Sequence, residues 1–149
     1  MLSFACVKLT KLQRQQIIRS LKANKNIVAV YLFGSQAKGG KPGRLSDVDL
    51  GIFLSPTYSQ KKHTKFLLGL FDELHQILKM PHIDLVNLKN APTLLRYRIL
   101  FEGEQLFDKK PSLTQELIFR AMQDYEDFRP HLETQEYLIL KKISSYVTA

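Results

Sequence analysis

The segment Ile27–Phe33 constrains the fold more than any other part of this sequence. Its residues, IVAVYLF, form a near-continuous apolar run with no alternation of apolar and polar positions. Such a run is typical of a strand that is covered on both of its faces. Gly34 and Ser35 follow directly and end the strand. The sequence therefore predicts a layered protein in which helices cover a buried sheet.

The remaining elements alternate between helical and strand patterns. Helices are expected where apolar residues recur every three or four positions, and strands where short apolar runs lie between turn residues. The tail from Ser112 carries a firm helical stripe, which Pro130 is expected to kink. In chain order we predict a helix at 8–24, the strand at 27–33, a strand at 47–54, a helix at 64–79, a strand at 83–88, a helix at 91–101, a short strand at 105–107 and the tail helix.

This order of elements predicts an α/β fold, with a small mixed sheet flanked by helices and a long C-terminal helix. The 149 residues fit one domain, with a core over about residues 8–108 and a helical tail over about residues 112–145. No apolar run approaches the roughly 18–20 residues of a membrane-spanning helix. The N-terminal residues lack a basic segment, so no signal peptide is expected.

The balance of charge and the cysteine content indicate the compartment and the partners. The chain has 22 Lys and Arg against 14 Asp and Glu, a formal charge of +8. These basic residues are scattered rather than clustered, so direct binding of nucleic acid is disfavoured. Cys6 is the single cysteine and cannot form an internal disulfide, which suits the reducing cytoplasm. The histidines lack metal-ligand spacing with one another or with Cys6 and are expected in structural or exposed positions: His63, His75, His82 and His131.

Asp47 and Asp49 open the second predicted strand. Side chains two residues apart in a strand point to the same face, so these carboxylates project together. Two such carboxylates repel each other unless a cation lies between them, and oxygen ligands favour a hard ion such as Mg²⁺. The alternative is that Asp47 belongs to an ordinary turn and that Asp49 faces water. The pair is therefore a candidate metal site.

Two further features are candidates for the same chemistry. Gly34-Ser35 follows a buried strand, where backbone N–H groups and a hydroxyl can hold phosphate, although a plain tight turn fits as well. Asp84 interrupts an apolar strand and either has a functional partner or lies at an edge that faces water. A phosphate cradle, a metal-binding pair and a third acid are together the parts of a two-metal nucleotidyl transfer.

These residues also carry a family resemblance. The stretch 32–39 (LFGSQAKG), followed by Ser46-Asp47-Val48-Asp49-Leu50, resembles the signature of the DNA polymerase β-like nucleotidyltransferase superfamily. The short chain is similar to the minimal nucleotidyltransferases (MNT) that act as antitoxins of HEPN-domain toxins. Eleven residues separate Ser35 from Asp47, one more than is usual. A one-residue insertion in a loop is a mild change, but it alters how Lys38, Lys41 or Arg44 reaches the triphosphate.

The resemblance implies a role for each candidate residue. Asp47, Asp49 and Asp84 would be the catalytic residues and would ligate Mg²⁺, most often two ions, with Asp84 also serving as base. Gly34 and Ser35 would bind the β- and γ-phosphates of ATP. The implied reaction transfers AMP to a hydroxyl, for which the expected acceptor is a tyrosine of a cognate HEPN RNase toxin.

Three other functions stay open from the sequence. The same chemistry could act on a small hydroxylated molecule such as an aminoglycoside, although such enzymes usually carry a substantial second domain. A catalytically silent module could instead neutralise a toxin by covering it. A basic nucleic-acid binder is the least favoured of the three and predicts a steep dependence of binding on salt.

Overall fold

The computed structural model describes residues 8–37, 47–80 and 82–147. Within them, four strands form one mixed sheet in the order β3-β2-β1-β4. Strand β1 is antiparallel to β2 and to β4, whereas β2 and β3 are parallel. The α/β fold with a small mixed sheet is thus confirmed. The strands are β1 (Ile27–Phe33), β2 (Val48–Leu54), β3 (Ile83–Asn87) and β4 (Glu104–Asp108).

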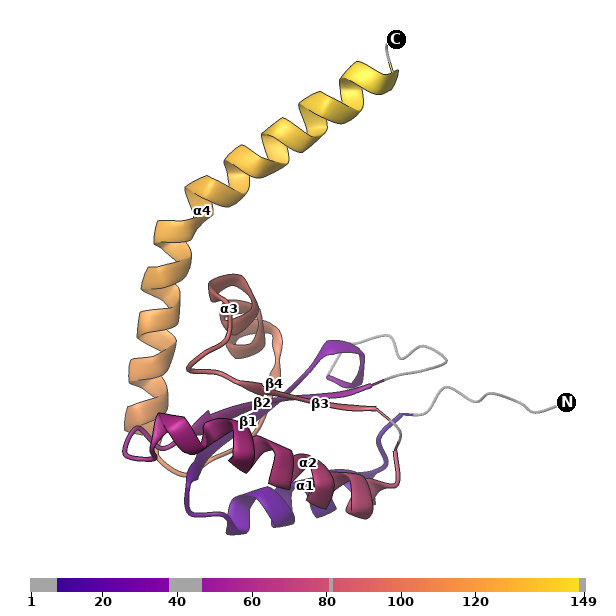
Figure 1. Cartoon of the computed structure of the whole chain (residues 1–149), viewed down its shortest axis with the longest axis vertical. Helices are drawn as coiled ribbons and strands as arrows, with labels where there is room; N and C mark the ends of the chain where they lie inside the picture. The colour runs from indigo at the N-terminus through magenta and orange to yellow at the C-terminus, as the bar shows by residue number, and fades with distance from the viewer. Residues whose placement is uncertain (1–7, 38–46, 81, 148–149) are drawn as a thin grey trace, which may run out of the picture.

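The helices cover both faces of this sheet. Helices α1 and α2 lie on one face, and α3 and the first half of α4 lie on the other (Figure 1). Val30 and Leu32 of β1 point into the core beneath α1 and α2, whereas Val28 and Tyr31 point into the core beneath α3 and α4. The central strand is therefore covered on both faces, as its apolar run predicts. The helices are α1 (Lys11–Ala23), α2 (His63–Leu78), α3 (Thr93–Glu102) and α4 (Pro111–Val147), with short 3₁₀ turns η1 (Gly34–Gln36) and η2 (Gln60–Lys62).

The predicted boundaries differ from the observed ones by up to three residues. Helix α1 begins at Lys11 rather than Lys8 because Thr10 caps it: its Oγ1 accepts a hydrogen bond from Gln13 N at 3.1 Å. The Gln13 side chain in turn accepts from Thr10 N at 2.9 Å, which completes a capping box. Pro92 precedes α3 instead of lying in its first turn, because its ψ of 147° is extended.

Helix α4 is continuous through Pro130 but bends about halfway along (Figure 1). Proline lacks the N–H that the preceding turn would bind, which accounts for a bend in this region. Leu117 and Ala121, in the first half, are buried against the sheet and α3, whereas the second half projects away from the body (Figure 1). None of the helices in the described part of the chain is long and apolar enough to cross a membrane.

Candidate active site

Asp49 and Asp84 lie side by side on adjacent parallel strands. They are register partners in the pairing of β2 with β3, and Asp49 is also the partner of Phe33 at the end of β1. Phe33 packs on the core beneath α3, so its partner Asp49 projects from the same face of the sheet. The strand pairing therefore brings together the end of β1 and the starts of β2 and β3, which carry or adjoin the predicted site residues.

Gly34 lies directly against the carboxylate of Asp49. Its φ of +69° is in the left-handed region that favours glycine, and a Cβ placed there would overlap Asp49 Oδ2. Gly34 begins η1, in which Ala37 N donates to Gly34 O at 3.2 Å. Ser35 is half-buried in this turn. The Gly-Ser turn thus lies directly beside Asp49.

The three acids influence one another electrostatically. Burial raises the pKa of the Asp49 carboxyl above its usual value, and the negative charges of Asp84 and then of Asp47 raise it further. Asp47 and Asp84 are exposed, whereas Asp49 is half-buried. Three mutually repelling carboxylates are a donor set that suits a hard divalent cation, since such an ion neutralises them. The chemistry of these residues therefore fits Mg²⁺.

The carboxylates are not drawn together into a closed metal cage. Among the residues that the structure describes, no three His, Cys, Asp or Glu side chains form a ready metal-binding group. Asp47 and Asp84 instead line an open cavity of about 310 Å³, together with Phe71, His82 and Ile83. Phe71 and Ile83 pack in the core beneath α1 and α2, and neither Gly34 nor Asp49 lines this cavity.

His82 lines this cavity although its sequence pattern does not mark it as a site residue. Its position two residues before Asp84 is the only signal in the sequence. By contrast, His63 is structural, as expected: it is buried, and its Nδ1 lies 2.8 Å from Asn87 Nδ2. Lys38, Lys41 and Arg44, the candidate triphosphate contacts, lie outside the described residues.

A hydrogen-bond network that supports η1 could not be predicted from the sequence. Arg14 of α1 donates from Nη1 to Glu104 Oε1 of β4 at 2.7 Å and from Nη2 to the backbone oxygen of Gln36 at 3.2 Å. The Gln36 side chain is fully buried, and its Oε1 accepts from Leu9 N at 3.0 Å. Arg14 and Glu104 are 90 residues apart, so no local pattern reveals the pair. The network ties the Gly-Ser turn to α1 and β4.

Comparison with known proteins relates this geometry to one family. The family model described as "Polymerase beta, Nucleotidyltransferase" matches residues 15–112. The protein adenylyltransferase MntA of Shewanella oneidensis is 29% identical over 98 residues, which cover 65% of this chain and 66% of MntA. The chain thus spans just under two thirds of that relative's length.

Solved structures share the fold over most of the chain. A crystal structure of the toxin-antitoxin MntA-HepT matches with a TM-score of 0.60 and 22% identity, over 91% of this chain and 99% of that one. A structure of the toxin-antitoxin with AMP-PNP matches with a TM-score of 0.61, 22% identity and the same coverage. A complex of tri-AMPylated Shewanella oneidensis HEPN toxin with MNT antitoxin matches with a TM-score of 0.59 and 21% identity, again over 91% and 99%.

Proposed function

The chain belongs to the polymerase β nucleotidyltransferase family, and on that premise we propose that it is a protein adenylyltransferase that acts as an antitoxin. Its donor is ATP and its acceptor is a tyrosine hydroxyl of a cognate HEPN-domain toxin. The similarity to MntA and to MntA-HepT complexes supports both assignments. Because ATP is the donor, the reaction takes place in the cytoplasm. Residues 8–108 form the catalytic core, and the helical tail over about residues 112–145 binds the toxin.

The observation that carries the proposal is the contact of Gly34 with Asp49, whose strand partner is Asp84. In this assignment, backbone N–H groups around Gly34 and the Ser35 hydroxyl bind the β- and γ-phosphates. Asp47, Asp49 and Asp84 hold Mg²⁺. Bound Mg²⁺ supplies neutralisation of phosphate charge and a lower pKa for the attacking hydroxyl.

Residues of this chain then accept the proton of the tyrosine hydroxyl and hold ATP in place for the reaction. The tyrosine oxygen forms a bond to the α-phosphorus of ATP, and the bond from that phosphorus to the bridging oxygen breaks, which releases pyrophosphate. The proton of the hydroxyl passes to an Asp84 oxygen. The turn at Gly34-Ser35 holds the leaving phosphates while the bond breaks. AMP remains on the toxin, and the electrons of the broken bond leave with pyrophosphate.

The test is AMP transfer from labelled ATP to a cognate HEPN-domain protein. Wild type with Mg²⁺ is expected to label that protein and to increase its intact mass by whole AMP units. Asp47→Asn/Asp49→Asn removes two charges from the site and is expected to abolish labelling. Asp72→Asn, at an exposed position of α2, is the matched control and is expected to label as wild type does.

Other outcomes separate the rival functions. Equal labelling by wild type and by Asp47→Asn/Asp49→Asn contradicts the proposed enzyme. Full neutralisation of the toxin in cells by that same variant indicates a silent binding module. Release of pyrophosphate with an aminoglycoside, but not with the HEPN-domain protein, indicates a small-molecule acceptor.

A further inference from the structure

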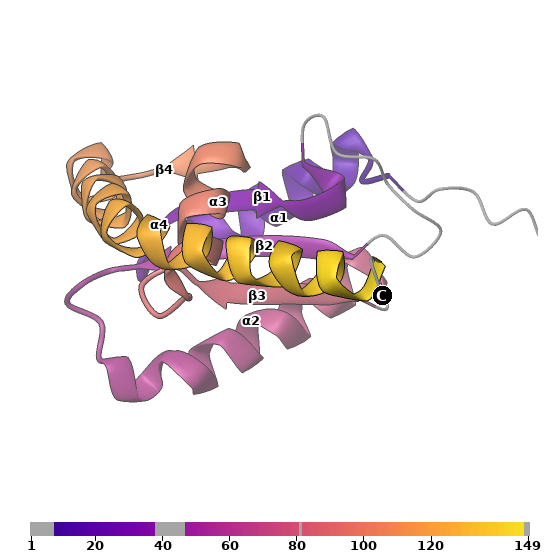
Figure 2. The same cartoon turned by 90° about the horizontal axis from the view of Figure 1, so that it is seen from above.

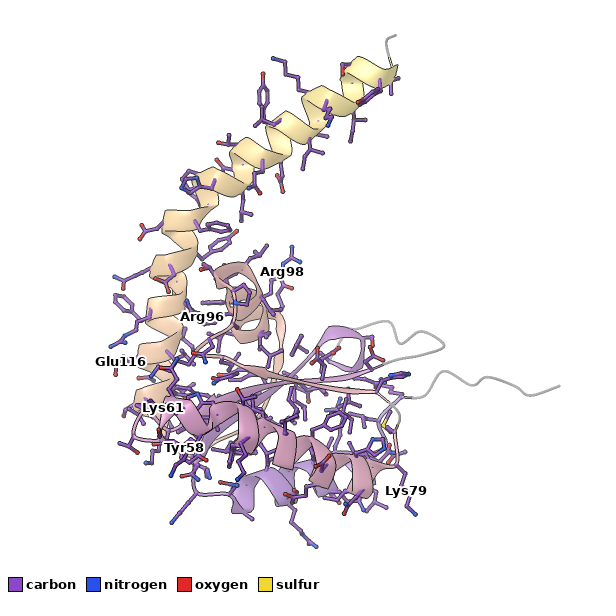
Figure 3. All side chains as sticks on the ribbon, in the orientation of Figure 1. Tyr58, Lys61, Lys79, Arg96, Arg98 and Glu116 are labelled. Carbon is purple, nitrogen blue, oxygen red and sulfur yellow. The ribbon has the colours of Figure 1, made fainter. Side chains whose placement is uncertain are left out.

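The second half of α4 carries a large apolar surface that is exposed in the described structure. Within residues 131–147, Leu132 is half-buried and every other residue is exposed. Figure 3 shows the side chains of this segment projecting on all sides of the ribbon, away from the body. We call residues 131–147 the distal segment. Seven of its large apolar residues are each more than half exposed: Tyr137, Leu138, Ile139, Leu140, Ile143, Tyr146 and Val147.

The arrangement of these side chains around the helix limits what can cover them. Tyr137, Leu138, Ile139 and Leu140 are consecutive, and successive helix positions are about 100° apart, so the four surround the axis. A helix that is apolar on all sides is normally enclosed rather than solvated. A single neighbouring helix covers only one side. The distal segment therefore fits a groove with apolar walls on at least two sides.

The distal segment also lies over the face of the sheet that carries the acids. Figure 1 shows it leaning above the face covered by α3, and Figure 2, seen from above, shows it running over β2 and β3. The first half of α4 is fixed to α3: the ring centroids of Tyr97 and Tyr125 lie 3.8 Å apart in a stacked arrangement, and Arg96 Nη2 donates to Asp124 Oδ2 at 2.5 Å. A protein that approaches the acids from this face of the sheet therefore meets the distal segment.

The charges of the distal segment exclude a mainly electrostatic partner. Glu133 and Glu136 balance Lys141 and Lys142, so the segment has no excess of positive charge, although the whole chain carries +8. Nucleic acid and anionic membranes attract helices with a basic face, which this segment lacks. A second copy of this chain could offer its own distal segment, but one helix leaves the other sides of Tyr137–Leu140 exposed. An apolar protein groove fits best.

We infer that the distal segment docks into an apolar groove of the same protein that receives AMP. This inference rests on the proposed function and specifies the surface through which the acceptor is held. The docked segment and the acceptor hydroxyl in the site then form two linked contacts with one partner. Once the distal segment is docked, the acceptor hydroxyl is held near the site at a high effective concentration. Docking therefore lowers the KM for the intact acceptor protein. It leaves ATP binding unchanged, because the distal segment contacts no residue of the site.

The experiment compares two variants with matched exposure. Leu138→Lys/Ile139→Glu places opposite charges on the distal segment without changing the net charge. Leu12→Lys/Leu68→Glu makes the same changes at exposed positions of α1 and α2, on the other face of the molecule. The distal variant is expected to raise the KM for the HEPN-domain protein about 10-fold or more, with kcat and the KM for ATP unchanged. The control variant is expected to behave as wild type, and circular dichroism checks that both keep their helices.

Binding is measured separately from AMP transfer, by calorimetry between each variant and the HEPN-domain protein. Weakened binding by the distal variant alone supports the inference even where wild type transfers no AMP, a result that would refute only the proposed function. Equal binding and equal KM for wild type and the distal variant overturn the inference. Light scattering that shows a wild-type dimer and a monomeric distal variant, with partner binding intact, also overturns it and assigns the surface to a second copy.

Discussion

Gly34 lies against the carboxylate of Asp49 so closely that no side chain fits between them. The two residues come from neighbouring strands, with Gly34 just after β1 and Asp49 in β2. The left-handed φ of Gly34 turns the backbone at this point. Both the absence of a side chain and the backbone conformation therefore restrict this position to glycine, which links the fold to the candidate site.

Gly34→Ala is expected to damage both stability and activity. A non-glycine residue in the left-handed region costs about 1–2 kcal/mol, and the new Cβ must also displace the Asp49 carboxylate. Chemical denaturation measures the loss of stability, and AMP transfer measures the loss of activity. Gly69→Ala is the control: it lies in α2 with nothing within 4 Å of the added Cβ, and it should stabilise the protein by roughly 0.8–1.0 kcal/mol. Gly34→Ala with wild-type stability and transfer would contradict this account.

Mg²⁺ is expected to raise the midpoint of thermal unfolding, since it neutralises the mutual repulsion of Asp47, Asp49 and Asp84. A ligand that binds only the folded state at 100 times its Kd adds about 2.7 kcal/mol. Asp49→Asn relieves part of the repulsion, so it should unfold at a higher temperature than wild type in EDTA and respond little to Mg²⁺. Asp72→Asn should keep the full response. If Mg²⁺ shifts all three proteins equally, the acids are not its site.

Arg14→Met is expected to weaken ATP binding without unfolding the protein. It removes the two donors that hold Glu104 and the backbone oxygen of Gln36, so the turn carrying Gly34-Ser35 loses its support. Loss of a residue that orients a ligand-binding group typically costs about 10–100-fold in affinity. Calorimetric titration with a non-hydrolysable ATP analogue measures the change, and Arg14→Lys should restore part of it.

The control for this prediction is Arg120→Met. Arg120 pairs with Glu116 on the exposed face of α4, and such surface pairs contribute roughly 0–1 kcal/mol to stability. It should therefore leave both stability and nucleotide affinity close to those of wild type. An Arg14→Met variant with unchanged affinity would limit the network to a structural role.

Gly51→Ala is expected to destabilise the protein while ATP affinity stays unchanged. A Cβ at Gly51 would lie 2.7 Å from Ile99 Cγ2 and 3.0 Å from Leu88 Cδ2, so the Ile99 side chain of α3 must move. Overpacking of this kind typically costs about 1–3 kcal/mol. Thermal unfolding and the same ATP titration separate the two effects. A loss of ATP affinity would show that the position of α3 controls the site.

Much of the fold could be predicted because its signals are local. The apolar run Ile27–Phe33 predicts the central strand, and the helical spacing of apolar residues predicts α2 and α4. The alternation of strand side chains predicts from the sequence alone that Asp47 and Asp49 lie on one face. The roles of these acids, of Asp84 and of the Gly34-Ser35 turn stay predictions that the experiments above test.

The sequence by itself determined the elements, the candidate acids and the glycine-serine turn, because strand and helix periodicity and turn chemistry depend on residues close together along the chain. Only the tertiary structure decided that Asp84 is the register partner of Asp49, that Arg14 reaches Glu104, and that the distal segment of α4 lies uncovered above the acid-bearing face. These relationships join residues from separate elements. They depend on strand order and on how whole faces pack, which no short stretch of sequence specifies.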